Sequence, residues 1–257
     1  MFIDSHCHLD FGCFSEQIET LLEQLNQAYI TKLIIPATQA SGWANIEQLS
    51  VRYSPIYYSL GIHPHFLNSF QEQDLTKLVA KLSTCSNKCI ALGEIGLDKF
   101  AAADEKLQES VFLRQLAIAQ QFGLPIILHC VKKQGRVLSL LNQQKFSCGG
   151  VYHAFSGSAD IANEFIKLGF KLGIGGVITY PNSTKTRETV AQLPVESLLL
   201  ETDAPDMPLY NQQTAINTPL NIITIFDALS ELRKEHKSQL ATQLYINACN
   251  IFPLSND

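Results

Sequence analysis

The sequence predicts an α/β fold, a TIM (β/α)8 barrel, and three observations carry this prediction. Eight short apolar runs are spread along the chain, segments with helical periodicity separate them, and the total length is 257 residues. Barrels built from eight βα units typically contain about 250 residues. Several of the runs do not alternate between apolar and polar residues, which is typical of parallel strands that are buried on both faces.

A doubly wound open sheet is the alternative fold. Such a sheet normally carries a glycine-rich phosphate-binding turn after its first strand, whereas this chain has HCHLD at 6–10. No linker or low-complexity segment divides the sequence, and we therefore expect a single domain over residues 1–257.

The expected strands are the apolar runs, and helical patterns lie between them. Apolar residues at 18, 21, 22 and 25 share one face of a helix. A second pattern, 104–122, stops before Gly123 and Pro125, and a third, 158–168, stops before Gly169, as is typical of helix ends. In chain order, the expected strands are 2–5, 32–37, 56–60, 90–93, 126–129, 150–153, 170–174 and 198–201.

Composition and charge exclude several classes of protein. Hydrophobic residues make up 46% of the chain, which excludes intrinsic disorder, and no apolar run approaches the ~20 residues that cross a bilayer. The net charge of −5 excludes a protein that coats duplex DNA with its whole surface. The N-terminal segment lacks the regions of a secretion signal and the seven cysteines are scattered, so we expect a cytoplasmic protein with reduced thiols.

Polar residues gather where the expected strands end, which is where barrel active sites lie. Six of the seven histidines follow or end a strand, and only His236 lies in a helical segment. Strand 90–93 is expected to end in Glu94, and strand 198–201 runs into Asp203. The histidines at strand ends are His6, His8, His63, His65, His129 and His153.

This pattern indicates a site for one or two divalent ions. His6 and His8 share a face if the strand continues through them, because side chains alternate in a strand, and Asp203 completes that shell. The two oxygens of Glu94 suit a bridge to a second ion, with His129 and His153 as its further ligands. Imidazole and carboxylate ligands fit Zn²⁺ or Mn²⁺, and also Mg²⁺ when waters are added.

Six motifs, each at an expected strand end, resemble those of the TatD family of metal-dependent hydrolases, and within it the bacterial YjjV-type members. The motifs are DSHCHLD at 4–10, GIHPH at 61–65, GEIGLD at 93–98, PIILH at 125–129, HAFSGS at 153–158 and ETDAPDMP at 201–208. The resemblance implies an amidohydrolase-like barrel and ester hydrolysis, typically by a deoxyribonuclease that acts on DNA ends. Carried over residue by residue, it implies the metal ligands His6, His8, Glu94, His129, His153 and Asp203.

The sequence departs from the family after two of these motifs. Lys132 and Lys133 stand where the family often has an arginine, and the segment after Asp203 lacks a basic stretch. Lys132 or Lys133 could supply the missing positive charge. Because phosphate-binding loops in barrels often follow the seventh and eighth strands, the candidate contacts to substrate phosphate are His63, Lys185 and Arg187. The alternatives are a structural turn around His63 and His65 and a solvated helix start at 184–187. Asp4 and Glu201 either orient ligands or form buried acid pairs.

We therefore expect a hydrolase of phosphodiester bonds that depends on two divalent ions and acts as a deoxyribonuclease of the exonuclease type. A metal-activated water is the expected nucleophile, with Asp203 as general base and Glu94 as the bridging ligand. The expected partner is DNA or another phosphoester bound at the metal site, with no membrane and no obligatory protein partner. The alternatives are a C–N bond hydrolase on the same barrel and a metal-binding scaffold protein. Relatives that cleave C–N bonds often have a modified lysine where this chain has Glu94.

Overall fold

Eight parallel strands, hydrogen-bonded in chain order, form the inner wall of the computed structural model, which describes residues 1–212 and 216–254. The Ser5 N–H donates to the Leu200 carbonyl at 3.0 Å, so the ends of the first and last strands meet and the barrel is nearly closed. The TIM-barrel prediction is confirmed. The strands are β1 (Phe2–Asp4), β2 (Ile30–Pro36), β3 (Ile56–Leu60), β4 (Cys89–Asp98), β5 (Ile126–Val131), β6 (Gly150–Tyr152), β7 (Phe170–Ile174) and β8 (Leu198–Leu200).

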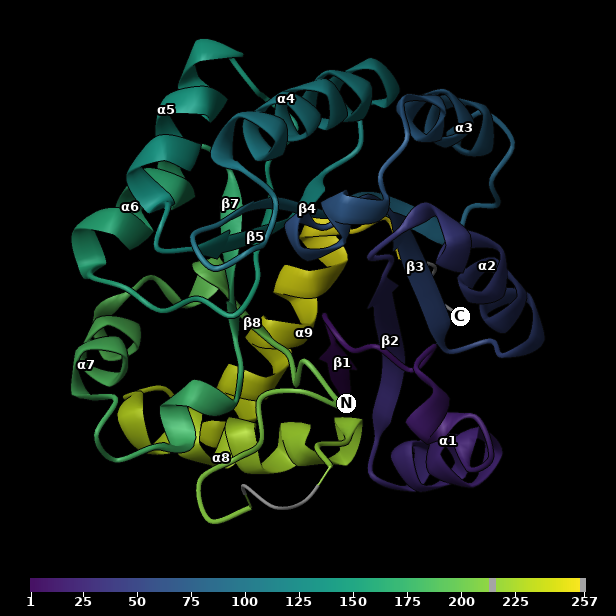
Figure 1. Ribbon diagram of the computed structural model, residues 1–257. Helices are drawn as coiled ribbons and strands as arrows, with labels where there is room; N and C mark the ends of the chain where they lie inside the picture. Colours follow the sequence, from purple (N-terminus) through teal and green to yellow (C-terminus); the bar gives the residue numbers. More distant parts are fainter. Residues whose placement is uncertain (213–215, 255–257) are drawn as a thin grey trace.

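Helices follow the strands and surround them as an outer ring (Figure 1). Within the described residues, no helix is long and apolar enough to cross a membrane. The helices are α1 (Ile18–Gln27), α2 (Trp43–Arg52), α3 (Glu72–Leu82), α4 (Glu105–Phe122), α5 (Gln134–Gln143), α6 (Ala159–Lys167), α7 (Thr184–Gln192), α8 (Ile222–Leu232) and α9 (Lys237–Ile251).

The strands are apolar on both faces because each face packs into a separate core. On β2, Leu33 belongs to the layer between strands and outer helices, whereas the adjacent Ile34 belongs to a second cluster inside the barrel. That inner cluster also contains Ala248 of α9 and Phe252 just beyond it. The inner core and α9 thus fill the amino-terminal end of the barrel, and the polar residues occupy the other end.

Local signals set the ends of α4 as expected. The Asp104 carboxylate accepts a hydrogen bond from the Leu107 N–H at 3.0 Å, which satisfies one free donor of the first turn. Gly123 follows the helix with a φ of +64°, a left-handed conformation that favours glycine.

The structure corrects two details of the sequence prediction. β4 does not end at Glu94 but continues to Asp98, and its pairing with β5 shifts register between Gly93 and Ile95. β1 ends at Asp4, so His6 and His8 lie beyond the strand and strand alternation does not place them.

Candidate metal centre

Backbone hydrogen bonds hold the segment that carries His6 and His8 across the mouth of the barrel. The Cys7 N–H donates to the Ile34 carbonyl at 3.1 Å, and the His8 N–H donates to the Ala204 carbonyl at 2.7 Å. The Asp203 N–H in turn donates to the His6 carbonyl at 2.8 Å. The segments after β1 and β8 are therefore fixed to each other, and their side chains meet.

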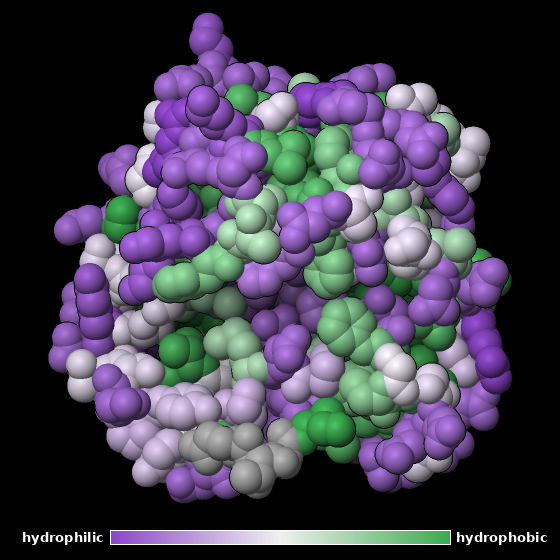
Figure 2. Space-filling model, in the orientation of Figure 1, coloured by the Kyte–Doolittle hydropathy of each residue, from purple (hydrophilic) through white to green (hydrophobic). Residues whose placement is uncertain are grey.

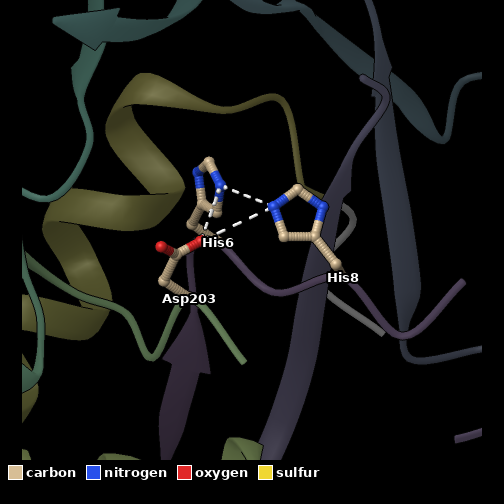
Figure 3. Close-up of side chains that lie close together, drawn as sticks. All are labelled: His6, His8 and Asp203. Atoms are coloured by element: carbon tan, nitrogen blue, oxygen red, sulfur yellow. Dashed lines mark hydrogen bonds and ion pairs between the residues drawn. The ribbon is translucent and has the colours of Figure 1, made fainter. Parts of the chain in front are cut away.

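His6, His8 and Asp203 form a first cluster with one oxygen of Glu94 (Figure 3). The Nε2 atoms of His6 and His8 are 3.3 Å apart, and they lie 3.4 and 3.5 Å from Asp203 Oδ1. Glu94 Oε2 is 3.4 Å from His6 Nε2 and 3.8 Å from His8 Nε2. Four potential ligand atoms thus surround one point.

The other oxygen of Glu94 faces a second cluster. Glu94 Oε1 lies 2.9 Å from both His129 Nδ1 and His153 Nε2, and 3.4 Å from His63 Nε2. Its side chain is buried at the register shift of β4, where its own N–H donates to the Ala37 carbonyl at 2.8 Å. The irregular strand therefore places one carboxylate between two groups of imidazoles.

These spacings fit divalent ions. Ligand atoms about 2.1 Å from one ion lie about 3.0 Å apart in an octahedral shell and about 3.4 Å apart in a tetrahedral one. The separations within the two clusters, mostly 2.9 to 3.5 Å, fall in this range. The Nδ1 atoms of His6 and His8 are buried without a hydrogen-bond partner, and the Nε2 atoms face the carboxylates. The chemistry and spacing of the donor set are those of a metal site.

Two further acids lie behind histidines of the second cluster, and the sequence pattern did not reveal the first of them. Asp98 Oδ2 accepts a hydrogen bond from His129 Nε2 at 2.8 Å, which leaves the lone pair of Nδ1 directed at Glu94. Glu201 Oε1 lies 3.6 Å from His153 Nδ1 and accepts a hydrogen bond from the Ala154 N–H. Such outer carboxylates fix the tautomer and orientation of metal-binding histidines. The signal for Asp98 was present, because it closes the GEIGLD motif.

His63 and His65 occupy different positions at the cavity. The His63 side chain is buried, and its Nδ1 accepts a hydrogen bond from the His65 N–H at 3.1 Å. His65 is nearly half exposed and donates from Nε2 to Asp98 at 2.8 Å. Asp98 therefore holds one histidine of the second cluster and one at the edge of the cavity.

Asp4 and Glu201 are both buried in the barrel, and the charge of Glu201 contributes to the raised pKa of Asp4. Asp4 accepts from the N–H groups of His6 and Thr202 at 3.2 and 3.0 Å, and the Thr202 hydroxyl donates to its second oxygen. Burial raises the pKa of Asp4 to about 8, and these hydrogen bonds oppose the rise only in part. Asp4 thus joins the segments after β1 and β8 through their backbones and does not contact the His6 imidazole.

In contrast to Asp4, the carboxylates that face the histidines have lowered pKa values. Burial alone would raise the pKa of Glu94, but His63, His153 and His6 hold it well below its usual range. Burial likewise opposes the ionisation of Asp203, and the hydrogen bond from His8 with the neighbouring imidazoles lowers its pKa. Both carboxylates are therefore ionised at neutral pH, as metal ligands must be.

The clusters form the floor of a cavity of about 430 Å³. Figure 2 shows a hollow near the middle of this face, with hydrophilic residues at its floor and hydrophobic residues around it. Apolar side chains at its edge include Phe11, Phe66, Val131 and Met207. Among the described residues that line the cavity there is no lysine or arginine.

The structure brings all six predicted ligands together with His63, but it places the two predicted cations elsewhere. Lys185 is exposed on α7, and Arg187 on the same helix donates to the Ile178 carbonyl. Neither lines the cavity. Asp206 does line it, and its carbonyl accepts a hydrogen bond from Asn217.

Comparison with known proteins identifies the family. The family model described as "TatD related DNase" matches residues 3–253. The chain is 41% identical to the "uncharacterized metal-dependent hydrolase YjjV" of Escherichia coli over 98% of its own length and 97% of that protein. It is 34% identical to an "uncharacterized metal-dependent hydrolase" of Haemophilus influenzae over 98% of this chain and 99% of that one.

A solved structure shows the same architecture. The crystal structure of YjjV from Escherichia coli, described there as a TatD homolog, superimposes with a TM-score of 0.95 at 40% identity, covering 99% of this chain and 98% of that one. With the family model matched across nearly the whole sequence, this chain belongs to the TatD family of metal-dependent hydrolases.

Proposed function

We propose that this hydrolase cleaves phosphodiester bonds of DNA from an end, with two divalent ions held side by side. The observation that carries the proposal is the division of the Glu94 carboxylate, whose Oε2 faces His6 and His8 while Oε1 faces His129 and His153. A single carboxylate shared by two imidazole groups is suited to a pair of ions. Paired ions are typical of enzymes that displace phosphoryl groups.

The proposed ligands divide between the two ions. His6, His8 and Asp203 would hold the first ion, His129 and His153 would hold the second, and Glu94 would contribute one oxygen to each group. When bound, Mg²⁺, Mn²⁺ or Zn²⁺ lowers the pKa of water and neutralises charge that develops on phosphate oxygens. Asp98 keeps Nδ1 of His129 turned towards Glu94, and Glu201 lies 3.6 Å from Nδ1 of His153.

Asp203 is the proposed general base. Its carboxylate is ionised, and its side chain is 14% exposed whereas that of Glu94 is 4% exposed. Asp203 also lines the cavity where substrate must enter. It is therefore the first-cluster carboxylate that is most open to a proton from an attacking water.

His63 is the proposed donor to a substrate oxygen. Burial lowers its pKa to about 4, so the ring is neutral at pH 7. Because Nδ1 accepts the hydrogen bond from the His65 N–H, the neutral ring carries its proton on Nε2. His63 lines the cavity, and its Nε2 lies 3.4 Å from Glu94 Oε1. Because Nε2 carries a proton, it suits a phosphate oxygen better than a metal ion.

DNA is proposed as substrate because of the relatives' descriptions and the ligand set. The family model is described as a DNase, and a mouse relative that is 28% identical is described as a "putative deoxyribonuclease". Glu94 at the bridging position, in place of a lysine, also favours phosphoester over C–N bond hydrolysis. Lys185 and Arg187 remain proposed contacts to more distant phosphates.

The test is hydrolysis of end-labelled single-stranded DNA with Mg²⁺, Mn²⁺ or Zn²⁺, in parallel with metal analysis. We expect shortening from one end, abolished by EDTA. Glu94→Gln should reduce the amount of bound metal. It should also lower turnover by more than about 100-fold, because replacing a residue that only supports a metal ligand already costs up to about 100-fold. Glu72→Gln, an exposed acid on α3, is the matched control. The proposal would be refuted if the metal-loaded protein left the DNA intact and cleaved amides instead.

A further inference from the structure

In the segments that link each strand to the following α-helix, lysines occur at one corner of the catalytic end of the barrel, and there is no arginine. The segments between each strand and the α-helix that follows it are 5–17, 37–42, 61–71, 99–104, 132–133, 153–158, 175–183 and 201–221. Their lysines and arginines are Lys99, Lys132 and Lys133, all in the neighbouring segments after β4 and β5. The other six segments contain none.

Two of these three lysines are available to bind an anion. Lys133 forms an ion pair with Glu105 at 2.7 Å. Lys99 and Lys132 are exposed, and neither ammonium group forms an ion pair or hydrogen bond with a residue that the structure describes. Their backbones are adjacent, because the Lys99 N–H donates to the Val131 carbonyl at 3.1 Å.

An exposed aromatic ring lies in the same turn. Phe100 is 69% exposed, and its N–H donates to Asp98 Oδ1 at 2.7 Å. The other oxygen of Asp98 holds His129 of the second cluster. One carboxylate thus fixes both the turn and a site histidine, and Val131, next to Lys132, lines the cavity.

We propose that Lys99, Phe100 and Lys132, here called the β4–β5 corner, bind the nucleotide next to the reacting one in a single-stranded substrate. This inference rests on the proposed function and adds where the substrate strand continues beyond the candidate metal centre. Free ammonium groups beside an exposed aromatic ring are typical of single-strand binding, where lysines contact phosphates and the ring stacks on a base. The cavity has no lysine or arginine of its own among the described residues, so a second phosphate finds its cation at this corner.

The first test measures binding of a fluorescent single-stranded oligonucleotide by anisotropy, in EDTA and over a range of salt. We expect Lys99→Ala/Lys132→Ala to reduce the slope of log affinity against log salt by about 1.4, or about 0.7 for each phosphate that is no longer neutralised. Phe100→Ala should weaken binding roughly 5- to 150-fold without changing the slope. Because no metal is present, this assay reports on the corner even if the proposed hydrolysis is wrong.

Matched controls are available at the opposite end of the barrel. Lys145, like Lys132, is exposed with a positive φ, and Tyr29 is 69% exposed, like Phe100. Lys145→Ala and Tyr29→Ala should leave binding unchanged. Equal losses from control and corner variants, or corner variants that bind as the wild type does, would overturn the proposal.

A second test uses turnover of the metal-loaded enzyme. The corner variants should lower kcat/KM for the oligonucleotide but not for bis(4-nitrophenyl) phosphate, which has no neighbouring nucleotide for the corner to bind. Equal effects on both substrates would show that the corner acts on the site itself and would refute the subsite. Absence of hydrolysis with either substrate would refute the proposed function and leave the binding assay to decide on the corner.

Discussion

A few side chains at the barrel mouth each serve two partners. The two oxygens of Glu94 face different imidazole groups, and the two oxygens of Asp98 hold His129 and the turn at Phe100. Burial would raise the pKa of Asp98, but its hydrogen bonds from His129, Phe100 and His65 keep it far below its usual range. A permanently ionised Asp98 is the acceptor that turns His129 Nδ1 towards the second cluster.

Replacing Asp98 with asparagine should weaken the second metal site. An amide keeps an acceptor oxygen but loses the charge, and such changes behind a ligand typically cost about 10- to 100-fold in metal affinity. We expect one of two ions to titrate more weakly by isothermal calorimetry. Glu109→Gln, on the surface of α4 and paired with Arg136, should leave both affinities unchanged. Two unaltered affinities for Asp98→Asn would show that His129 is oriented without this hydrogen bond.

At the scale of elements, irregular strands position the site. The register shift in β4 places Glu94 between the clusters, and the short β1 and β8 end early enough for their following segments to cross the barrel mouth. The neighbouring β7 accommodates Glu201 because it has Gly173 beneath that side chain. A Cβ atom at Gly173 would lie 2.0 Å from Glu201 Oε2.

Gly173→Ala should therefore destabilise the protein. Overpacking of a tight site usually costs about 1–3 kcal/mol, and displacing Glu201 would also disrupt its hydrogen bond from the Ala154 N–H. Urea unfolding measures the change. Gly135→Ala, at a position on α5 with no atom within 4 Å of the added carbon, should instead stabilise by about 0.5–1 kcal/mol. A Gly173→Ala protein as stable as the wild type would mean that Glu201 is free to move.

At the scale of the whole molecule, the residues of the inner core and the residues of the candidate site lie at opposite ends of the barrel. The inner core and α9 fill one end, and the candidate metal ligands occupy the other. The protein has a net charge of −5, so attraction of an anionic substrate depends on the ions and on the few cations near the mouth.

Phe252→Ala tests this separation. Loss of a fully buried ring typically costs about 3–5 kcal/mol, and Phe252 is 1% exposed at the closed end. We expect a lower unfolding midpoint but unchanged metal content in the folded protein. Ile246→Ala, on the preceding helix α9 and 42% exposed, should change stability far less. Metal loss in folded Phe252→Ala would show that the two ends are coupled.

The sequence by itself determined the barrel, and it named the six candidate metal ligands that the structure brings together. Runs that are apolar on both faces, such as 32–37, require burial on both faces, and only a few folds provide such burial. Each expected strand therefore overlaps an observed strand. Six potential ligands were visible because parallel strands bring their carboxyl ends to one side. Each of these inferences depends on local pattern and on chain order.

Only the tertiary structure decided how these side chains divide into clusters and what supports them. Strand alternation did not place His8, because the Cys7 N–H donates to β2 and the His8 N–H donates to the segment after β8. Asp98 was missed because its partners are far away in sequence: His65 lies in the segment after β3, and His129 lies on β5. Contacts between distant segments depend on register and closure of the barrel, which no local pattern encodes.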